Sequence, residues 1–147
     1  MPQTDREGHS SGSGKPRIVF LCVHNAGRSQ MAAAWARRLG GERVEVLSGG
    51  SNPASDVNPT VIRAMAEAGI DISRRLPSPW TEEMVRSADV VITMGCGDSC
   101  PVFPGVTYRD WPVRDPHGKG IESVRRIRDD LESRVRALIA ELTESPV

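Results

Sequence analysis

The chain has 147 residues and a mass of 16.0 kDa, which is a usual size for one domain with one hydrophobic core. Its 19 basic and 19 acidic residues balance, and this neutrality argues against a general nucleic-acid-binding protein, which normally carries a basic excess. Three cysteines are an odd number and too few for the disulfide framework of a small secreted domain.

The first 16 residues are polar and rich in glycine and serine, and we expect a disordered tail there, followed by one domain over 17–147. The tail has no apolar core that would serve as a signal peptide. The apolar runs at 18–23 and 90–94 fall short of the roughly 20 residues that a membrane helix needs. We therefore expect a soluble, cytoplasmic protein that binds no membrane, in a compartment where most cysteines are free thiols.

Predicted strands and helices alternate along the rest of the chain. The apolar run at 17–22 predicts a strand buried on both faces, and after a loop the Ala-rich segment 28–39 predicts a helix that ends at Gly40 and Gly41. The same patterns predict strands at 44–49, 89–94 and 106–113 and helices at 60–69, 81–88 and 121–142. This alternation predicts an α/β fold, a single-domain doubly wound parallel sheet flanked by helices.

All three cysteines follow predicted strands. Cys22 ends the first strand, and Cys96 and Cys100 lie in the Gly- and Pro-containing loop after the strand at 89–94. Ligands in doubly wound folds bind beyond the carboxyl ends of the strands. The three thiols can therefore share one edge of the sheet.

The segment CVHNAGRS (22–29) places a cysteine, five residues, an arginine and a hydroxyl residue between a strand and a helix. Such a loop points backbone N–H groups inward and forms a nest for a tetrahedral oxyanion. Gly27 permits a close approach and Arg28 can hold two oxygens, while the positive potential favours a nucleophilic Cys22 thiolate that accepts a hydrogen bond from Ser29. An inert buried cysteine is the alternative. The residues expected to bind the oxyanion are Val23, His24, Asn25, Ala26, Gly27 and Arg28.

Thiolate attack on a phosphate-like centre needs a proton donor for the departing oxygen. Asp115 is our candidate, because Pro116 stiffens its turn and the turn follows a predicted strand. Asp110 is the rival candidate. For either residue the alternative is a turn-capping role, which is common for aspartate beside proline and glycine.

Cys96 and Cys100 enclose three residues, and their thiols can form a disulfide with each other if the loop bends. A simple phosphatase needs neither thiol. Two incidental loop cysteines are the alternative, but their position beside the Cys22 loop favours thiol–disulfide relay chemistry. The cysteines and histidines lack a zinc spacing, so we expect no metal site.

Together these features resemble a known family, the thioredoxin-coupled arsenate reductases built on the low-molecular-weight protein tyrosine phosphatase fold. The resemblance covers nearly the whole chain after the tail. It rests on five segments: FLCVHNAGRSQMAAAW (20–35), SGGSNPASDVNP (48–59), AGIDIS (68–73), DVVITMGCGDSCPVFPG (89–105) and DWPVRDPHGK (110–119).

The resemblance implies that Cys22 attacks arsenate while Asp115 donates a proton. Cys96 then attacks the Cys22 sulfur and releases arsenite, and Cys100 closes a Cys96–Cys100 disulfide that thioredoxin reduces. Phosphate and sulfate are then competing oxyanions, reduced thioredoxin is the electron donor, no cofactor is tightly bound, and the physiological role is arsenical detoxification.

The chain departs from the family at two places. Cys96 and Cys100 are closer in sequence than the thiol pair of the best-known members, which implies a smaller motion during the relay. Ala33 stands where some members place a glutamate that helps bind a potassium ion. Potassium binding is therefore doubtful, although Asn25, Ser48 and Asp71 match the other ligands.

Three other functions remain open. A low-molecular-weight tyrosine phosphatase needs only Cys22, Arg28 and Asp115, but such enzymes carry aromatic residues after the acid, where this chain has His117 and Gly118. A reductase coupled to glutathione or mycothiol does not require the second thiol pair. A non-catalytic oxyanion sensor would tolerate loss of Cys22.

Overall fold

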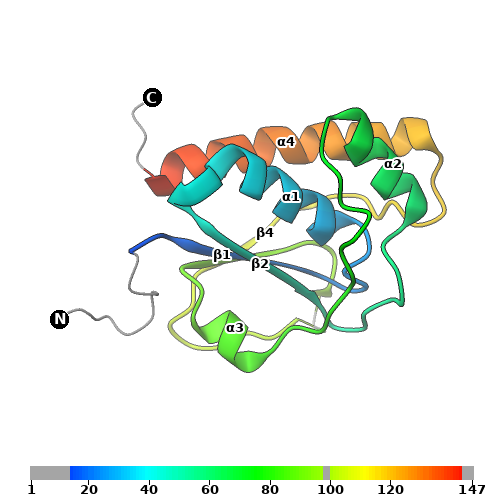
Figure 1. Cartoon of the computed structure of the whole chain (residues 1–147). Coiled ribbons are helices and arrows are strands. Elements are labelled where there is room, and N and C mark those ends of the chain that lie inside the picture. Colours follow the sequence, from blue (N-terminus) through cyan, green and yellow to red (C-terminus); the bar gives the residue numbers. More distant parts are fainter. Residues whose placement is uncertain (1–13, 98–99, 144–147) are drawn as a thin grey trace.

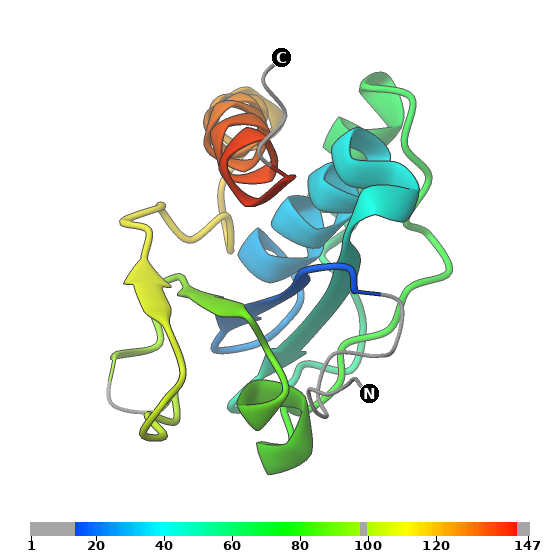
Figure 2. The same ribbon diagram turned by 90° about the vertical axis from the view of Figure 1, so that its left-hand side faces the viewer.

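The computed structural model describes residues 14–97 and 100–143 (Figure 1). Its sheet is parallel throughout, with the strand order β2–β1–β3–β4. These strands are β1 Arg17–Cys22, β2 Glu45–Gly50, β3 Val90–Thr93 and β4 Tyr108–Asp110. Helices α1 Arg28–Gly40, α2 Pro59–Glu67 and α4 Ile121–Thr143 lie over one face and α3 Glu82–Arg86 over the other (Figures 1 and 2). The predicted doubly wound α/β fold is confirmed.

The element boundaries differ from the predicted ones by a few residues. Helix α1 ends at Gly40, and its C-cap is Gly41, whose φ of 55° lies in the left-handed region that glycine adopts readily. Helix α3 is shorter than predicted, although Thr81 caps it as expected by accepting a hydrogen bond from the Met84 N–H. Strand β4 covers only 108–110 because only these three residues pair with β3.

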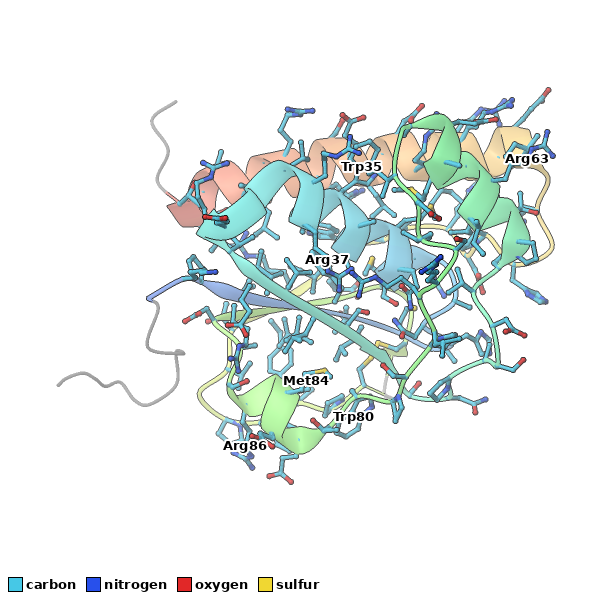
Figure 3. All side chains as sticks on the ribbon, in the orientation of Figure 1. Trp35, Arg37, Arg63, Trp80, Met84 and Arg86 are labelled. Carbon is cyan, nitrogen blue, oxygen red and sulfur yellow. A yellow bond between two sulfur atoms is a disulfide. The ribbon has the colours of Figure 1, made fainter. Side chains whose placement is uncertain are left out.

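The sheet separates two apolar clusters. Ile18, Phe20 and Cys22 of β1 face α1 and α4, whereas Val19 and Leu21 face α3. Helix α1 is enclosed between the sheet and α4, so ten of its 13 residues are buried, and its alanines allow both layers to approach closely. The Trp35 indole N–H, on the α4 side of α1, donates to the Arg128 carbonyl at 3.1 Å (Figure 3).

Strand β1 lies between β2 and β3, so the chain order in the sheet reverses beside it. A reversal of this kind opens a crevice at the carboxyl end of the strand, where ligands of doubly wound folds bind. Cys22 is the last residue of β1. The topology therefore places this thiol at the crevice.

Two expectations concern the ends of the chain and membranes. The predicted tail lies outside the described residues as far as residue 13, and residues 14–16 precede β1 without helix or strand. None of the helices in the described residues combines the length and apolar character needed to span a bilayer.

Glu67 connects α2 to α4 through ion pairs with Arg125 at 2.7 Å and Arg128 at 3.2 Å. The hydrogen bond from Arg125, reinforced by the charges of both arginines, lowers the pKa of Glu67 to about 2 from 4.5. A pKa lowered by folding stabilises the protein above pH 4.5, and this contribution is lost as the pH falls through about 2.

We therefore expect Glu67→Gln to lower Tm slightly at pH 7, because the carboxylate is exposed, and the difference from wild type to shrink between pH 4.5 and 2. Calorimetry over that pH range measures it. Glu132→Gln is the matched control, since Glu132 pairs with Arg136 within α4 rather than between helices. A Glu67→Gln difference that stays constant down to pH 2 would contradict this assignment.

Candidate active site

The loop after β1 turns its carbonyl oxygens toward the segment 51–58. The carbonyls of Cys22, Val23, His24 and Ala26 accept hydrogen bonds of 2.8–3.3 Å from backbone N–H groups of that segment. Within the described residues, the N–H groups from Val23 to Arg28 donate to no protein acceptor. A loop with bonded carbonyls and unbonded N–H groups has the polarity of an oxyanion nest.

Asn25 holds the loop in this conformation. It is fully buried, and its φ of 51° places it in the left-handed region, which asparagine tolerates better than most residues. Its amide donates to Ser29 Oγ at 2.6 Å, and its Oδ1 accepts from the Ser78 N–H at 3.0 Å and from Gln30 at 3.2 Å. These contacts tie the loop to the first turn of α1 and to the Ser78 backbone.

Ser29 lies within hydrogen-bond distance of the Cys22 sulfur. The Ser29 Oγ lies 2.9 Å from the Cys22 Sγ. Because Asn25 donates to the same Oγ, the Ser29 hydroxyl hydrogen can be directed at the sulfur. Cys22 is the free cysteine of the described residues, 2% exposed, and it lies at the base of the cleft described below.

Arg28 joins the oxyanion loop to the segment that carries Asp115. Its side chain is 8% exposed, donates to the Val113 carbonyl at 3.3 Å and lies 3.6 Å from the Asp115 carboxylate. The other Asp115 oxygen accepts the His117 N–H at 3.0 Å. Asp115 therefore caps its own turn and also faces Arg28, so the two alternatives considered for it are compatible.

A cleft of about 580 Å³ opens at this site. Two carboxylates among the described residues line it, Asp115 and Asp56. Asp110 does not line it, and its carboxylate instead accepts from Thr93 Oγ1 at 2.8 Å. Sequence reasoning missed Asp56 and the surrounding wall, because the segment 54–59 lacks the charge or thiol pattern that marks the Cys22 loop. The cleft is lined by Cys22, His24, Ala26–Arg28, Ala54–Pro59 and Asp115–Gly118.

Two glycines allow neighbouring loops to touch the Cys22 loop. The close approach at Gly27 comes from Pro116, since a Cβ on Gly27 would lie 2.5 Å from the Pro116 ring. Gly95 packs against the Arg28 guanidinium with a φ of 79°, and a Cβ there would collide with the guanidinium nitrogen atoms. Gly95 was not among the predicted site residues, and only its place after a strand that meets the Cys22 strand hints at its role.

Cys96 and Cys100 form a disulfide, with their Cα atoms 5.6 Å apart. The pair lies at the same edge of the sheet as Cys22, but it belongs to the apolar cluster on the α3 face. Trp80 and Met84 pack against that cluster (Figure 3). Cys22 belongs to the cluster on the α1 face. The three sulfurs thus share an edge but not a face, and both disulfide cysteines are at most 7% exposed.

Two of the residues considered for a potassium site, Asn25 and Ala33, have no side-chain oxygen to spare. The Asn25 Oδ1 already accepts two hydrogen bonds, and Ala33 is buried and supplies no side-chain oxygen. Asp71 is exposed, and hydrogen bonds from Ser73 hold its pKa below the ordinary value.

Residues 17–146 match the family described as low molecular weight phosphotyrosine protein phosphatase. The chain is 42% identical over 136 residues to a putative arsenate reductase of Halobacterium salinarum, which covers 89% of this chain and 96% of that protein. It is 38% identical over 130 residues to a glutaredoxin arsenate reductase of Synechocystis sp., with 86% and 98% of the two chains covered.

Among solved structures, the chain is similar to Corynebacterium glutamicum thioredoxin-dependent arsenate reductase Cg_ArsC1′. The TM-score is 0.76 and the sequence identity 41% over 89% of this chain. The match spans 63% of the length of the Corynebacterium protein.

The contact between Gly95 and Arg28 predicts that Gly95→Ala displaces the guanidinium. We expect the affinity for inorganic phosphate, measured by isothermal titration calorimetry, to fall by about tenfold, because small displacements of a positioned group are costly. Gly105→Ala is the matched control, since Gly105 also has a positive φ, of 85°, but no atom near its Cβ position. A folded Gly95→Ala protein with unchanged affinity would rule out this positioning role.

Proposed function

Because the chain belongs to the low molecular weight phosphotyrosine protein phosphatase family, we propose that it is an arsenate reductase that works through Cys22, Cys96 and Cys100. One observation carries this proposal. A free cysteine in an oxyanion loop and a disulfide between the two remaining cysteines lie at one edge of the same sheet. A phosphatase uses the first feature and has no use for the second.

In the first step the Cys22 thiolate attacks As(V) of arsenate bound to the N–H groups of Val23–Arg28 and to Arg28. An As–O bond breaks, and the departing oxygen takes a proton from Asp115 and leaves as water. Arsenate takes the place of the Asp115 carboxylate as the partner of Arg28. Ser29 donates to the Cys22 sulfur.

The next two steps are thiol–disulfide chemistry. Cys96 attacks the Cys22 sulfur, and the electron pair of the broken S–As bond stays on arsenic, which leaves as arsenite, As(III). The two sulfurs are oxidised to a Cys22–Cys96 disulfide. Cys100 then attacks Cys96 and frees the Cys22 thiolate, which gives the disulfide state described here.

Cys96 must pass from the α3 face of the sheet to the Cys22 side during this relay. Gly95 and Gly97 flank it, with φ values of 79° and 53°. Glycine has low barriers to a change of backbone conformation. These two glycines are therefore the hinges of the motion, and the rest of the domain, which we assign to 17–147, stays in place.

The Cys96–Cys100 disulfide favours thioredoxin as the electron donor, because thioredoxin reduces protein disulfides. Its dithiol donates two electrons to a protein disulfide and is itself oxidised to a disulfide. The similarity to the thioredoxin-dependent Corynebacterium protein supports this donor, whereas the Synechocystis relative supports a glutaredoxin-coupled route as the second candidate. Either donor operates in the cytoplasm, where thiols are kept reduced, and we assign the protein to that compartment.

Asp115→Asn tests the proton donor. We expect the single-turnover rate of arsenite formation to fall by about 100-fold or more, because general acid catalysis contributes that much. Asp56→Asn, which removes the other carboxylate lining the cleft, is the matched control and should change the rate little. An unchanged rate in Asp115→Asn, or an equal loss in both variants, would contradict the assignment.

Serine variants of the three cysteines test the relay. Cys22→Ser should form no adduct and no arsenite, and Cys96→Ser should form the adduct without releasing arsenite. Cys100→Ser should release about one arsenite per protein molecule and stop as a Cys22–Cys96 disulfide, which mass spectrometry detects after alkylation. Arsenite formation and NADPH oxidation are measured with thioredoxin and thioredoxin reductase.

Two results would contradict the relay. Full multi-turnover activity in Cys100→Ser would show that the third thiol is not needed. Glutaredoxin and glutathione supporting Cys96→Ser as well as wild type would assign the chain to the second route instead.

A further inference from the structure

We propose that a second cleft, lined by the two ends of the Asp115 loop, binds a multiply charged oxyanion of the polyphosphate class. This cleft has a volume of about 460 Å³ and lies between the segment 112–114 and the first turns of α4. It shares no lining residue with the cleft at Cys22. The proposal does not depend on the arsenate reductase activity.

Three cationic side chains line this cleft: Arg114, Lys119 and Arg126. Within the described residues, none of their side-chain nitrogens has a hydrogen-bond or ion-pair partner. Other surface arginines do, such as Arg125 with Glu67 and Arg136 with Glu132. Three unpaired cations around one hollow repel each other, and an anion relieves that repulsion.

The lining contains one carboxylate, Asp130, and it is already engaged. Its Oδ2 accepts from Arg134 at 3.1 Å, one turn further along α4. The charge facing a ligand is therefore positive on balance. Val113 and Ile127, each 7% exposed, supply an apolar floor beneath these charged side chains.

The size and charge of the cleft favour a chain of phosphoryl groups over a single tetrahedral ion. The cations come from three separate places, the two ends of the 114–119 loop and the second turn of α4. A diphosphate or longer anion presents oxygens on several sides and matches cations that come from separate segments better than one tetrahedral ion does. Arg114 and Arg126 can each hold two of these oxygens.

The position of the cleft gives the ligand a consequence for the active site. Arg114 and Lys119 lie at the two ends of the loop whose middle, Asp115–Gly118, lines the Cys22 cleft. The Val113 carbonyl in turn accepts from Arg28. An anion that binds both cations therefore fixes the loop that carries Asp115.

Titration of the ¹⁵N-labelled full chain with inorganic pyrophosphate at constant ionic strength tests the proposal. We expect amide signals of 112–114 and 119–127 to shift along one binding curve, and signals of 23–29 to follow another with a different Kd. Arg126→Glu should weaken the first curve by about tenfold or more and leave the second unchanged. The same spectra show whether the variant is folded.

Arg136→Glu is the matched control, because Arg136 lies on the same helix about 15 Å further along and outside the cleft. It should leave both curves unchanged. Shifts at 112–127 that follow the 23–29 curve in every protein would mean that pyrophosphate binds the Cys22 loop alone. Equal weakening by Arg126→Glu and Arg136→Glu would mean a general charge effect. Either result would overturn the proposal.

Discussion

The structure of the site depends on the unbonded N–H groups between Cys22 and Arg28. Backbone N–H groups without partners are costly, and a loop left to itself would rearrange to bond them. Here the segment 51–58 bonds the carbonyls of the same loop. Asn25 is the non-glycine residue of the loop with left-handed backbone, and its side-chain hydrogen bonds hold it there. Because the carbonyls are already bonded outward, the N–H groups remain available to an anion. Residue 50, which adjoins this segment, must also be a glycine, because a Cβ there would lie 2.6 Å from the Val23 carbonyl oxygen and push the loop away.

Arg28 extends this constraint from one loop to three. It starts α1, contacts Gly95 before the disulfide, bonds the Val113 carbonyl and faces Asp115. A guanidinium that is 8% exposed has little freedom, so a shift in any of these segments is felt at the oxyanion loop. Arg28 lines the Cys22 cleft and donates to the carbonyl of Val113, which lines the second cleft, so this side chain connects the two. Contacts with the buried Arg28 guanidinium thus hold the loops that follow different strands in fixed positions relative to each other.

The sequence was most informative where one contiguous segment carried both structure and chemistry. An apolar run predicts the strand that ends at Cys22, the motif at 22–29 predicts the loop, and an alanine-rich segment predicts the helix that follows. The choice between Asp115 and Asp110 required the structure, because Asp110 ends β4 and Asp115 follows it closely in sequence. Only the contacts show that Asp115 faces Arg28 whereas Asp110 accepts a hydrogen bond from Thr93. Gly95 and the segment 51–58 act through backbone atoms and through space that a Cβ would fill, and such contacts leave no residue pattern to read.

The two faces of the sheet give the disulfide its conformational meaning. In a parallel sheet the residues just beyond two neighbouring strands can be close along the edge and still belong to opposite cores, as Cys22 and the Cys96–Cys100 pair do. While the disulfide is closed, Cys96 has no free thiol and is packed in the cluster on the α3 face. Reduction would break the bond to Cys100 and leave Cys96 between Gly95 and Gly97, the hinges of the proposed relay. In the proposed relay, the disulfide is thus both the product of the chemistry and a bond that must be reduced before the next cycle.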